Sequence, residues 1–293
     1  MRQMLAYLGL RAGVGLVGML PKRVTRALGR IAGRLWHSFD SRRRNMARRH
    51  MRRIMGAAAD AETAAALVMQ SYGRYLAEAL WVREKRIAGM LDETVVEGLE
   101  RIIEARDKGL GMIYALPHMG NWEVAAPVSG REGVPVVAVA ENLPNRRITD
   151  WFTRMRAECG IEVVLATGRL EVMRKLEQAL VENKAVALPS DRDLRRTGVE
   201  VEFFGERTTL PPGPATLAIR TGAPLFPVGT YFEGDGYRVV VNEAIPIPEG
   251  IPRSDQVRVM TQTLAREFES IIGKAPEQWL VLMPNWPSDR EAD

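Results

Sequence analysis

The sequence predicts an α/β protein in which helices flank a central, mostly parallel sheet. Short, continuously apolar segments of strand length alternate with longer amphipathic segments between residues 97 and 188. That alternation is typical of parallel strands joined by crossover helices. The apolar run 111–116 does not change polarity from one residue to the next, which indicates a strand buried on both faces of its sheet.

Length and composition fit a protein that buries a full core. The chain has 293 residues, of which 46% are hydrophobic and 26% charged, as in an ordinary globular protein. We expect one α/β domain over residues 57–293, preceded by a basic segment over residues 1–56. Because Cys159 is the single cysteine, the sequence excludes an internal disulfide and a thiolate-rich metal cluster and favours a reducing compartment.

The positive charge of the chain is concentrated near its N-terminus. The net charge is +5, but residues 1–53 contain fourteen Lys or Arg and one acid, Asp40. We expect amphipathic N-terminal helices that lie on the surface of an anionic membrane. Over residues 22–39, helical spacing separates an apolar face from a basic one, namely Val24, Leu28, Ile31, Leu35 and Phe39 from Arg23, Arg26, Arg30 and Arg34.

Residues 1–20 do not meet the requirements of a membrane-spanning helix. They are apolar, but Arg2 and Arg11 interrupt them, whereas a span needs about 20 apolar residues. They also lack the small-residue cleavage site of a secretion signal. We therefore expect a peripheral protein on the cytoplasmic face of the plasma membrane.

Two other interpretations of the basic segment stay open. The arginines at positions 42–44, 48–49 and 52–53 could neutralise the phosphates of a nucleic acid. No recognition module accompanies them, so we expect no nucleic-acid partner. The segment could also present a solvated basic face and pack on the rest of the protein.

Each further element follows from hydrophobic spacing and from its boundary residues. Asp60 is a good N-cap for a helix that continues to Val82, and Ser254 is expected to cap the last long helix. The prolines of 211–214 suit the first turn of a short helix, and residues 234–236 suit the turn of a hairpin. We expect helices over residues 60–82, 97–108, 147–159, 170–183, 214–222 and 254–272, and strands over residues 111–116, 134–140, 162–165, 184–188, 225–231 and 237–242.

The stretch 118–123 places an imidazole and a carboxylate directly after a predicted strand. Residues 122–126 have the pattern of a helix start, with Asn121 as its cap and Glu123 in its first turn. A neutral imidazole can take the proton of an alcohol while a carboxylate fixes its tautomer and stabilises the imidazolium. We expect His118 to be a general base and Glu123 its orienting acid. The alternative is a structural histidine beside a helix-capping acid.

Polar residues follow three predicted strands at their carboxyl ends. They are His118, Glu141, and Asp191 with the adjacent Arg192-Asp193. Ligands of open α/β sheets bind beyond the carboxyl ends of the strands, so we expect these residues to converge in one active site. The alternative for Asp191 is a helix cap or a surface ion pair.

Other common site motifs are absent or stand in the wrong context. The glycines at positions 13, 15 and 18 match the dinucleotide-binding fingerprint, but no strand precedes them. The sequence has no Walker loop and no Gly-x-Ser-x-Gly. Its three histidines are too few and too dispersed for a zinc site. We expect no metal and no bound cofactor.

Three groups of residues form an ordered series along the chain. They are the stretch 115–123, the segment 151–156, and Asp191-Arg192-Asp193-Leu194 followed by Phe203-Phe204-Gly205-Glu206. This series resembles the bacterial lysophospholipid acyltransferases, a family that includes the lipid A late acyltransferases. Within it the sequence is most similar to the actinobacterial phosphatidylinositol mannoside acyltransferases, through residues 198–206, 212–215 and 232–236. The likeness spans roughly residues 60–286.

The resemblance implies transfer of a fatty acyl group, palmitoyl, from acyl-CoA to a mannose hydroxyl of a phosphatidylinositol mannoside. It implies direct attack on the thioester, with His118, Glu123 and Asp191 as catalytic residues and backbone amides near residues 120–122 stabilising the oxyanion. Glu123 departs from an Asp in the family, and Asp191 departs from a Glu. The implied substrate-binding residues are Asn121, Trp122, Glu141, Arg156, Arg192, Phe203, Phe204 and Gly205.

The expected partners are acyl-CoA, a glycolipid acceptor and an anionic membrane surface. Three other functions stay open. An acyltransferase for another glycolipid or lysophospholipid could take its acyl group from an acyl-carrier protein. A non-catalytic protein with the same fold could bind lipids at a membrane. A thioesterase would use water in place of the alcohol.

Overall fold

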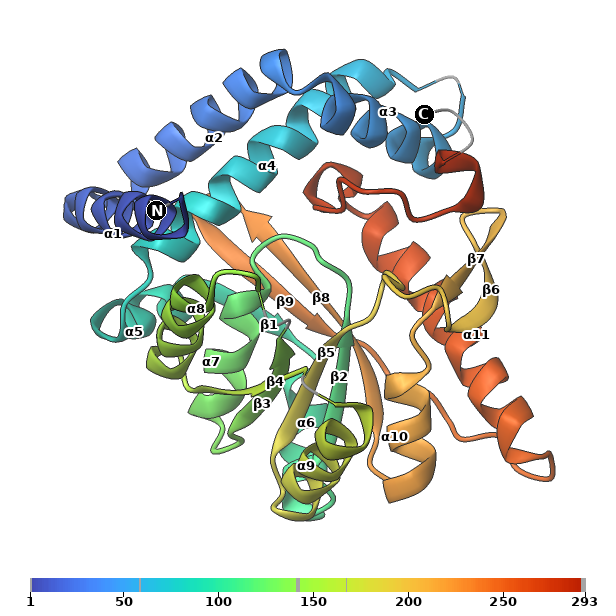
Figure 1. Ribbon diagram of the computed structural model, residues 1–293. Helices are drawn as coiled ribbons and strands as arrows, with labels where there is room; N and C mark the ends of the chain where they lie inside the picture. The colour runs from blue at the N-terminus through green and yellow to red at the C-terminus, as the bar shows by residue number, and fades with distance from the viewer. Residues whose placement is uncertain (1, 58, 141–142, 167, 291–293) are drawn as a thin grey trace.

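A seven-stranded sheet forms the centre of the computed structural model, which describes residues 2–57, 59–140, 143–166 and 168–290. Its strand order is β1-β9-β8-β2-β5-β3-β4, and every neighbouring pair is parallel except β8 and β9. Helices cover both faces of the sheet (Figure 1). The predicted α/β class with a mostly parallel sheet is confirmed.

The strands of this sheet are short and connected largely by helices. They are β1 (Thr94–Glu97), β2 (Met112–Leu116), β3 (Val136–Ala140), β4 (Ile161–Leu165), β5 (Ala185–Pro189), β8 (Leu225–Glu233) and β9 (Gly236–Val241). A separate antiparallel pair comprises β6 (Val199–Phe203) and β7 (Glu206–Leu210). All five residues of β2 are buried, as expected for a strand with both faces covered.

The helices fall into an N-terminal group and a group around the sheet. The N-terminal group is α1 (Arg2–Met19), α2 (Lys22–Phe39), α3 (Ser41–Met55) and α4 (Ala61–Trp81). The other helices are α5 (Glu84–Asp92), α6 (Leu99–Asp107), α7 (Ala125–Arg131), α8 (Arg146–Glu158), α9 (Arg169–Val181), α10 (Gly213–Thr221) and α11 (Arg253–Gly273). Single 3₁₀ turns are η1 (Trp122–Val124), η2 (Pro276–Gln278) and η3 (Pro287–Asp289).

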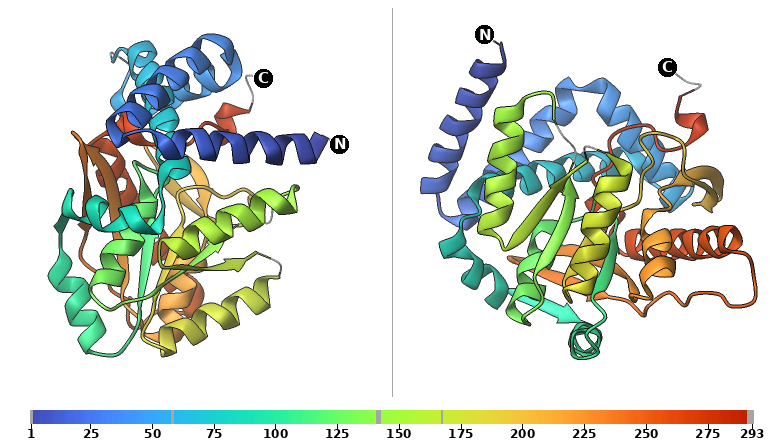
Figure 2. Two further views of the ribbon diagram at one scale, coloured as in Figure 1. Left: turned by 90° about the vertical axis from the view of Figure 1, so that its left-hand side faces the viewer. Right: turned by 60° about the horizontal axis from the view of Figure 1, so that its bottom comes forward.

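Helices α2, α3 and α4 lie across one end of the sheet, and α1 projects to the side (Figures 1 and 2). Helix α2 packs closely on α4 because both present glycines at the crossing. A Cβ added to Gly33 would lie 2.1 Å from the carbonyl oxygen of Met69, and one added to Gly73 would lie 2.1 Å from that of Gly29. The small residues therefore set the separation of the two helices.

The packed face of α2 is not its apolar face. Arg26 and Thr25 are buried against α4, whereas the apolar side chains predicted from the helical spacing point away from the protein. Their exposed fractions are 42% for Val24, 49% for Leu28, 54% for Ile31, 56% for Leu35 and 85% for Phe39. We call these five residues the α2 stripe. Across the described ranges, no helix is both long and apolar enough to span a membrane.

Most predicted elements are confirmed, and the differences have simple causes. Asp60 caps α4 by accepting a hydrogen bond from the Thr63 amide at 3.0 Å. Ser254 does not cap α11, because the helix already begins after Pro252, whose ring fixes the backbone there. The Asn121 side chain does not cap the following helical turn, since its amide group donates a hydrogen bond to Glu78 instead. The sequence does not predict the short elements α5, β1, β6 and β7, because they lack a long apolar or amphipathic pattern.

The substitution Gly33→Ala is expected to destabilise the protein. The added methyl group would collide with the α4 backbone, which cannot rotate away, so we expect the free energy of unfolding to fall by about 2 kcal/mol. Thermal or urea unfolding measures this change. Gly13→Ala in α1 is the matched control, because its Cβ meets no atom within 4 Å. Equal stability of the two variants would contradict the close helix crossing.

Candidate active site

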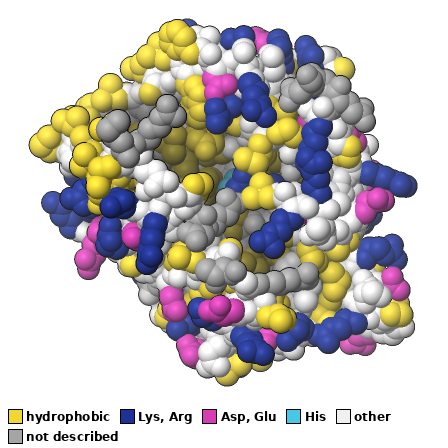
Figure 3. Space-filling view, in the orientation of Figure 1, with side chains coloured by type: hydrophobic (Ala, Val, Ile, Leu, Met, Phe, Trp, Pro, Cys, Tyr) yellow, Lys and Arg dark blue, Asp and Glu magenta, His cyan; other side chains and the backbone are white. Residues whose placement is uncertain are grey.

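A cavity of about 860 Å³ opens between α4 and the carboxyl ends of the central strands. Its volume lies in the range of small-molecule binding sites. His118 lines it, together with apolar side chains from several elements. Figure 3 shows hydrophobic side chains around a hollow on this face of the molecule. The apolar lining includes Tyr72, Tyr75, Leu76 and Ala79 from α4, Val139 from β3, Val172, Met173 and Leu176 from α9, Leu188 from β5, and Leu280 and Val281 near the C-terminus.

His118 and Asp191 form a close pair beneath this cavity. The His118 Nδ1 lies 2.6 Å from Asp191 Oδ1, and the His118 amide donates to Asp191 Oδ2 at 2.9 Å. The imidazole is 18% exposed, whereas the carboxylate is fully buried. Within the described part of the chain, His118 Nε2 has no hydrogen-bond partner. The pair therefore leaves one ring nitrogen available to a ligand in the cavity.

Asp191 remains ionised in spite of its burial. Burial alone would raise the pKa of this carboxyl, but His118 and the indole of Trp279 favour the charged form and leave the pKa below its usual value. Trp279 Nε1 donates to Asp191 Oδ2 at 2.7 Å, and Asn285 Nδ2 donates to the Asp191 carbonyl at 3.0 Å. Sequence reasoning missed Trp279 and Asn285, because nothing near them in the chain signals a partner 88 or 94 residues away.

The segment 278–280 braces the His118 loop through backbone hydrogen bonds. The Leu280 amide donates to the His118 carbonyl at 2.8 Å, and the Gly120 amide donates to the Gln278 carbonyl at 3.0 Å. Gly120 adopts a positive φ of 56°, and a Cβ there would lie 2.3 Å from the Thr230 carbonyl oxygen, so only glycine fits. Because the Gly120 amide already donates to Gln278, it is not free to stabilise an oxyanion. Of the backbone amides expected to do so, those of residues 121 and 122 remain.

Glu123 does not contact His118 in this structure. Its carboxylate accepts from Arg156 Nη2 at 2.8 Å and from the Tyr75 hydroxyl at 3.4 Å, and no hydrogen bond joins it to the imidazole among the described atoms. The charge of Glu123 raises the pKa of Arg156 further above its usual value. Asp191, rather than Glu123, therefore holds the acid position next to the ring. Glu123 instead fixes Arg156, which lines the cavity.

Asn121 is held beneath the site by a buried acid of α4. Glu78 is fully buried and accepts from Asn121 Nδ2 at 2.8 Å and from the Tyr237 hydroxyl at 2.9 Å. It also pairs with Arg26 of α2 at 2.5 Å and with Arg74 at 2.9 Å. Burial would raise the pKa of Glu78, but Arg74 and Arg26 lower it overall. Glu78 thus links α2 and α4 to the loop that carries His118.

The remaining residues of the predicted site divide into two groups. Trp122 and Arg192 line the cavity, and the Trp122 ring stacks on Tyr75 at 4.1 Å. Phe203 ends β6 and stacks on Trp286, and Phe204 and Gly205 form the turn to β7. None of these three residues lines the cavity. Glu141 lies outside the residues that the structure describes. Among the residues that the structure describes, no group of three or more His, Cys, Asp or Glu could hold a metal ion.

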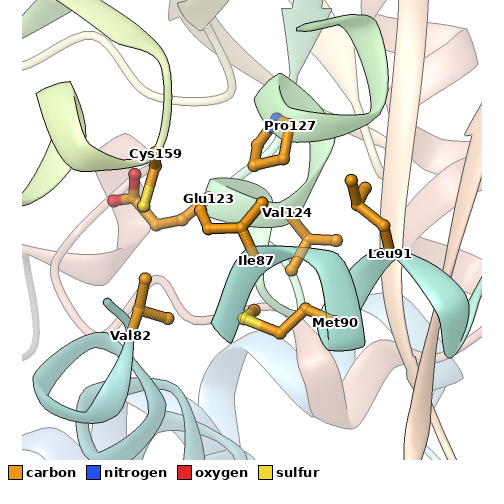
Figure 4. Close-up of a pocket in the computed structure, with 8 residues that line it drawn as sticks. All are labelled: Val82, Ile87, Met90, Leu91, Glu123, Val124, Pro127 and Cys159. Atoms are coloured by element: carbon orange, nitrogen blue, oxygen red, sulfur yellow. The ribbon is translucent and has the colours of Figure 1, made fainter. Parts of the chain in front are cut away.

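Cys159 lies behind the site rather than in it. Its thiol is next to the Glu123 carboxylate at a small cavity with apolar walls (Figure 4). With a volume of about 10 Å³, this cavity is too small for a substrate. Burial and the negative charge of Glu123 raise the pKa of the Cys159 thiol to about 12. The thiol is therefore protonated at neutral pH and a poor nucleophile.

Comparison with known proteins identifies the class to which this fold and site belong. The family model for bacterial lipid A biosynthesis acyltransferases matches residues 1–288, so the chain belongs to this acyltransferase family. The phosphatidylinositol mannoside acyltransferase of Mycobacterium tuberculosis is 36% identical over 248 residues, which are 83% of this chain and 77% of that protein. The phosphatidylinositol mannoside acyltransferase of Mycolicibacterium smegmatis is 37% identical over 222 residues, which are 75% and 71% of the two chains. The resemblance found in the sequence is confirmed.

The substitution Cys159→Ala is expected to leave acyl transfer within about twofold of the unaltered rate, because a protonated, enclosed thiol takes no part in the reaction. Iodoacetamide at pH 7.5 should likewise leave the transfer rate of the native chain unchanged. Radiolabelled acyl transfer measures both. A folded Cys159→Ala protein without activity would contradict this assignment.

Proposed function

We propose that the chain transfers a palmitoyl group from acyl-CoA to a mannose hydroxyl of a phosphatidylinositol mannoside. The observation that carries this proposal is the His118–Asp191 pair beneath a large cavity, with Nε2 left without a partner. The family supplies the acyltransferase class, and the two mycobacterial relatives act, by their names, on phosphatidylinositol mannoside.

The pair supports general-base catalysis with direct attack on the thioester. Asp191 accepts a hydrogen bond from Nδ1–H, so Nε2 of the neutral ring carries a lone pair. His118 Nε2 takes the proton of the mannose hydroxyl while the hydroxyl oxygen attacks the carbonyl carbon of the thioester. The C–S bond then breaks, the ester remains on the sugar, and the imidazolium returns the proton to the departing CoA sulfur. Asp191 stabilises the imidazolium between these steps.

The walls of the cavity suit the two substrates. The apolar side chains of α9, β3 and β5 can surround a hydrocarbon chain, which gains free energy by leaving water. Arg156 presents a guanidinium that Glu123 holds in place, and such a group can donate to sugar hydroxyls. The amides of Asn121 and Trp122 are the proposed donors to the oxyanion of the tetrahedral intermediate.

The α2 stripe supports a peripheral position on the cytoplasmic face of the plasma membrane. Five apolar side chains along one helix face outward, and Arg23 and Arg30 are exposed on the same helix. An amphipathic helix of this kind binds membranes through apolar burial and through attraction to anionic lipids. This position would deliver a lipid acceptor to the cavity without removing it from the bilayer.

The substitution His118→Ala is expected to lower kcat for transfer by about 10³-fold or more, because His118 is the one imidazole among the described residues that line the cavity. Asp191→Asn should lower it by about 10²- to 10⁴-fold, because the amide no longer stabilises the imidazolium or fixes the ring. Mass spectrometry of lipid products formed from palmitoyl-CoA and from a palmitoyl carrier-protein thioester measures the rates and the donor.

His37→Ala is the matched control, because His37 lies on α2 away from the cavity. Circular dichroism establishes that each variant is folded. A folded His118→Ala protein that acylates the mannoside at the native rate would overturn the catalytic role. Release of free palmitate at the full rate with saturating acceptor would favour a thioesterase instead.

The double substitution Leu35→Glu, Phe39→Glu is expected to weaken binding to anionic vesicles by at least about tenfold, since two exposed apolar anchors are lost. Leu170→Glu, Val181→Glu on α9 is the control, because these side chains are 78% and 77% exposed but lie outside the α2 stripe. Vesicle sedimentation at low and high salt measures binding. An equal loss of binding in the control would contradict membrane attachment through α2. Equal binding to neutral and anionic vesicles would contradict the electrostatic contribution to that attachment.

A further inference from the structure

The described residues that line the cavity carry a large excess of positive charge. Among the described residues of this lining there are five arginines and one acid, Asp193. Figure 3 shows Lys and Arg side chains around the hollow. Apolar walls account for a hydrocarbon chain but not for these cations. The lining arginines are Arg42, Arg43, Arg156, Arg192 and Arg195.

Acidic partners within the protein account for two of these arginines. Arg43 pairs with Asp40 at 2.5 Å, and Arg156 pairs with Glu123 at 2.8 Å. Arg42 of α3 and Arg195, which follows β5, form no ion pair with any residue that the structure describes. Both are exposed and therefore lie where the cavity meets solvent.

Asp193, the acid among the described residues that line the cavity, is already hydrogen-bonded to its own local structure. Asp193 Oδ2 accepts from the Gly198 amide at 2.7 Å and from the Thr209 hydroxyl at 3.0 Å, and its Oδ1 accepts from the Arg195 amide at 3.1 Å. Its carboxylate thus holds the backbone after β5 rather than the guanidinium of Arg195. The positive charge at the cavity mouth is left for an external anion.

We infer that Arg42 and Arg195 form a phosphate-binding rim at the mouth of the cavity. The inference rests on the proposed function, because both proposed substrates carry phosphate. Acyl-CoA has a pyrophosphate and a ribose phosphate at the end remote from its thioester, and the acceptor has a phosphodiester. With the reacting carbonyl at His118 and the acyl chain inside, a phosphate group of one substrate reaches the rim. Guanidinium groups bind phosphate oxygens with paired, charge-assisted hydrogen bonds.

The rim is tested by comparing substrates with and without phosphate in the variant Arg42→Gln, Arg195→Gln. The donors are palmitoyl-CoA and palmitoyl-pantetheine, and the acceptors are a short-chain, monodisperse phosphatidylinositol mannoside and an alkyl mannoside. Monodisperse acceptors remove membrane binding from the measurement. We expect the KM for the phosphate-bearing substrate that the rim holds to rise about tenfold, with kcat within about twofold.

The pattern of KM values identifies the source of the phosphate. A higher KM for palmitoyl-CoA but not for palmitoyl-pantetheine assigns the rim to the donor. A higher KM for the phosphatidylinositol mannoside but not for the alkyl mannoside assigns it to the acceptor lipid. Unchanged KM values for all four substrates would overturn the inference, and the proposed function would stand because transfer continues.

Arg207→Gln, Arg258→Gln is the matched control. Both side chains are well exposed, at 83% and 66%, neither lines the cavity, and the loss of charge is the same. An equal rise of KM in this control would show that the effect comes from the overall charge, and it would overturn the inference that Arg42 and Arg195 bind phosphate. If the unaltered chain transfers palmitate between none of these pairs, the proposed function itself fails.

Discussion

The buried carboxylate of Asp191 is the interaction on which the site depends. It receives hydrogen bonds from the ring and the amide of His118 and from the indole of Trp279, and it has no contact with solvent. A buried charge is stable only when such partners are in place, and removal of one partner typically costs several kcal/mol. The strands β2 and β5, the His118 loop and the C-terminal segment must therefore all be positioned before the imidazole is oriented.

A second buried acid connects the site to the N-terminal helices. Glu78 of α4 contacts Arg26 of α2 on one side and Asn121 of the His118 loop on the other. The glycine crossing brings the backbones of α2 and α4 into close contact. The helix that carries the exposed α2 stripe is therefore joined, through one buried carboxylate, to the loop three residues beyond the imidazole.

The sequence predicts the sheet and the position of His118 well, because apolar runs and a strand-end histidine are local signals. It does not identify the acid that contacts the imidazole. Glu123 is near in sequence and Asp191 is distant, but the register of β2 on β5 brings the ends of those strands together. The supporting residue Trp279 is further still from His118. Such contacts depend on how segments meet in space, so composition and spacing do not reveal them. The position of Asp191 after a predicted strand placed it in the expected site but did not show that its carboxylate contacts the imidazole.

The tautomer of His118 decides whether its imidazole can act as the base. The 15N chemical shifts of the ring in the labelled native protein at neutral pH distinguish a protonated ring nitrogen from an unprotonated one, and only three histidines require assignment. We expect Nδ1, next to Asp191, to carry the proton and Nε2 to be unprotonated. A neutral ring with its proton on Nε2 and none on Nδ1 would contradict the role of His118 as the base, because a protonated Nε2 could not accept the hydroxyl proton.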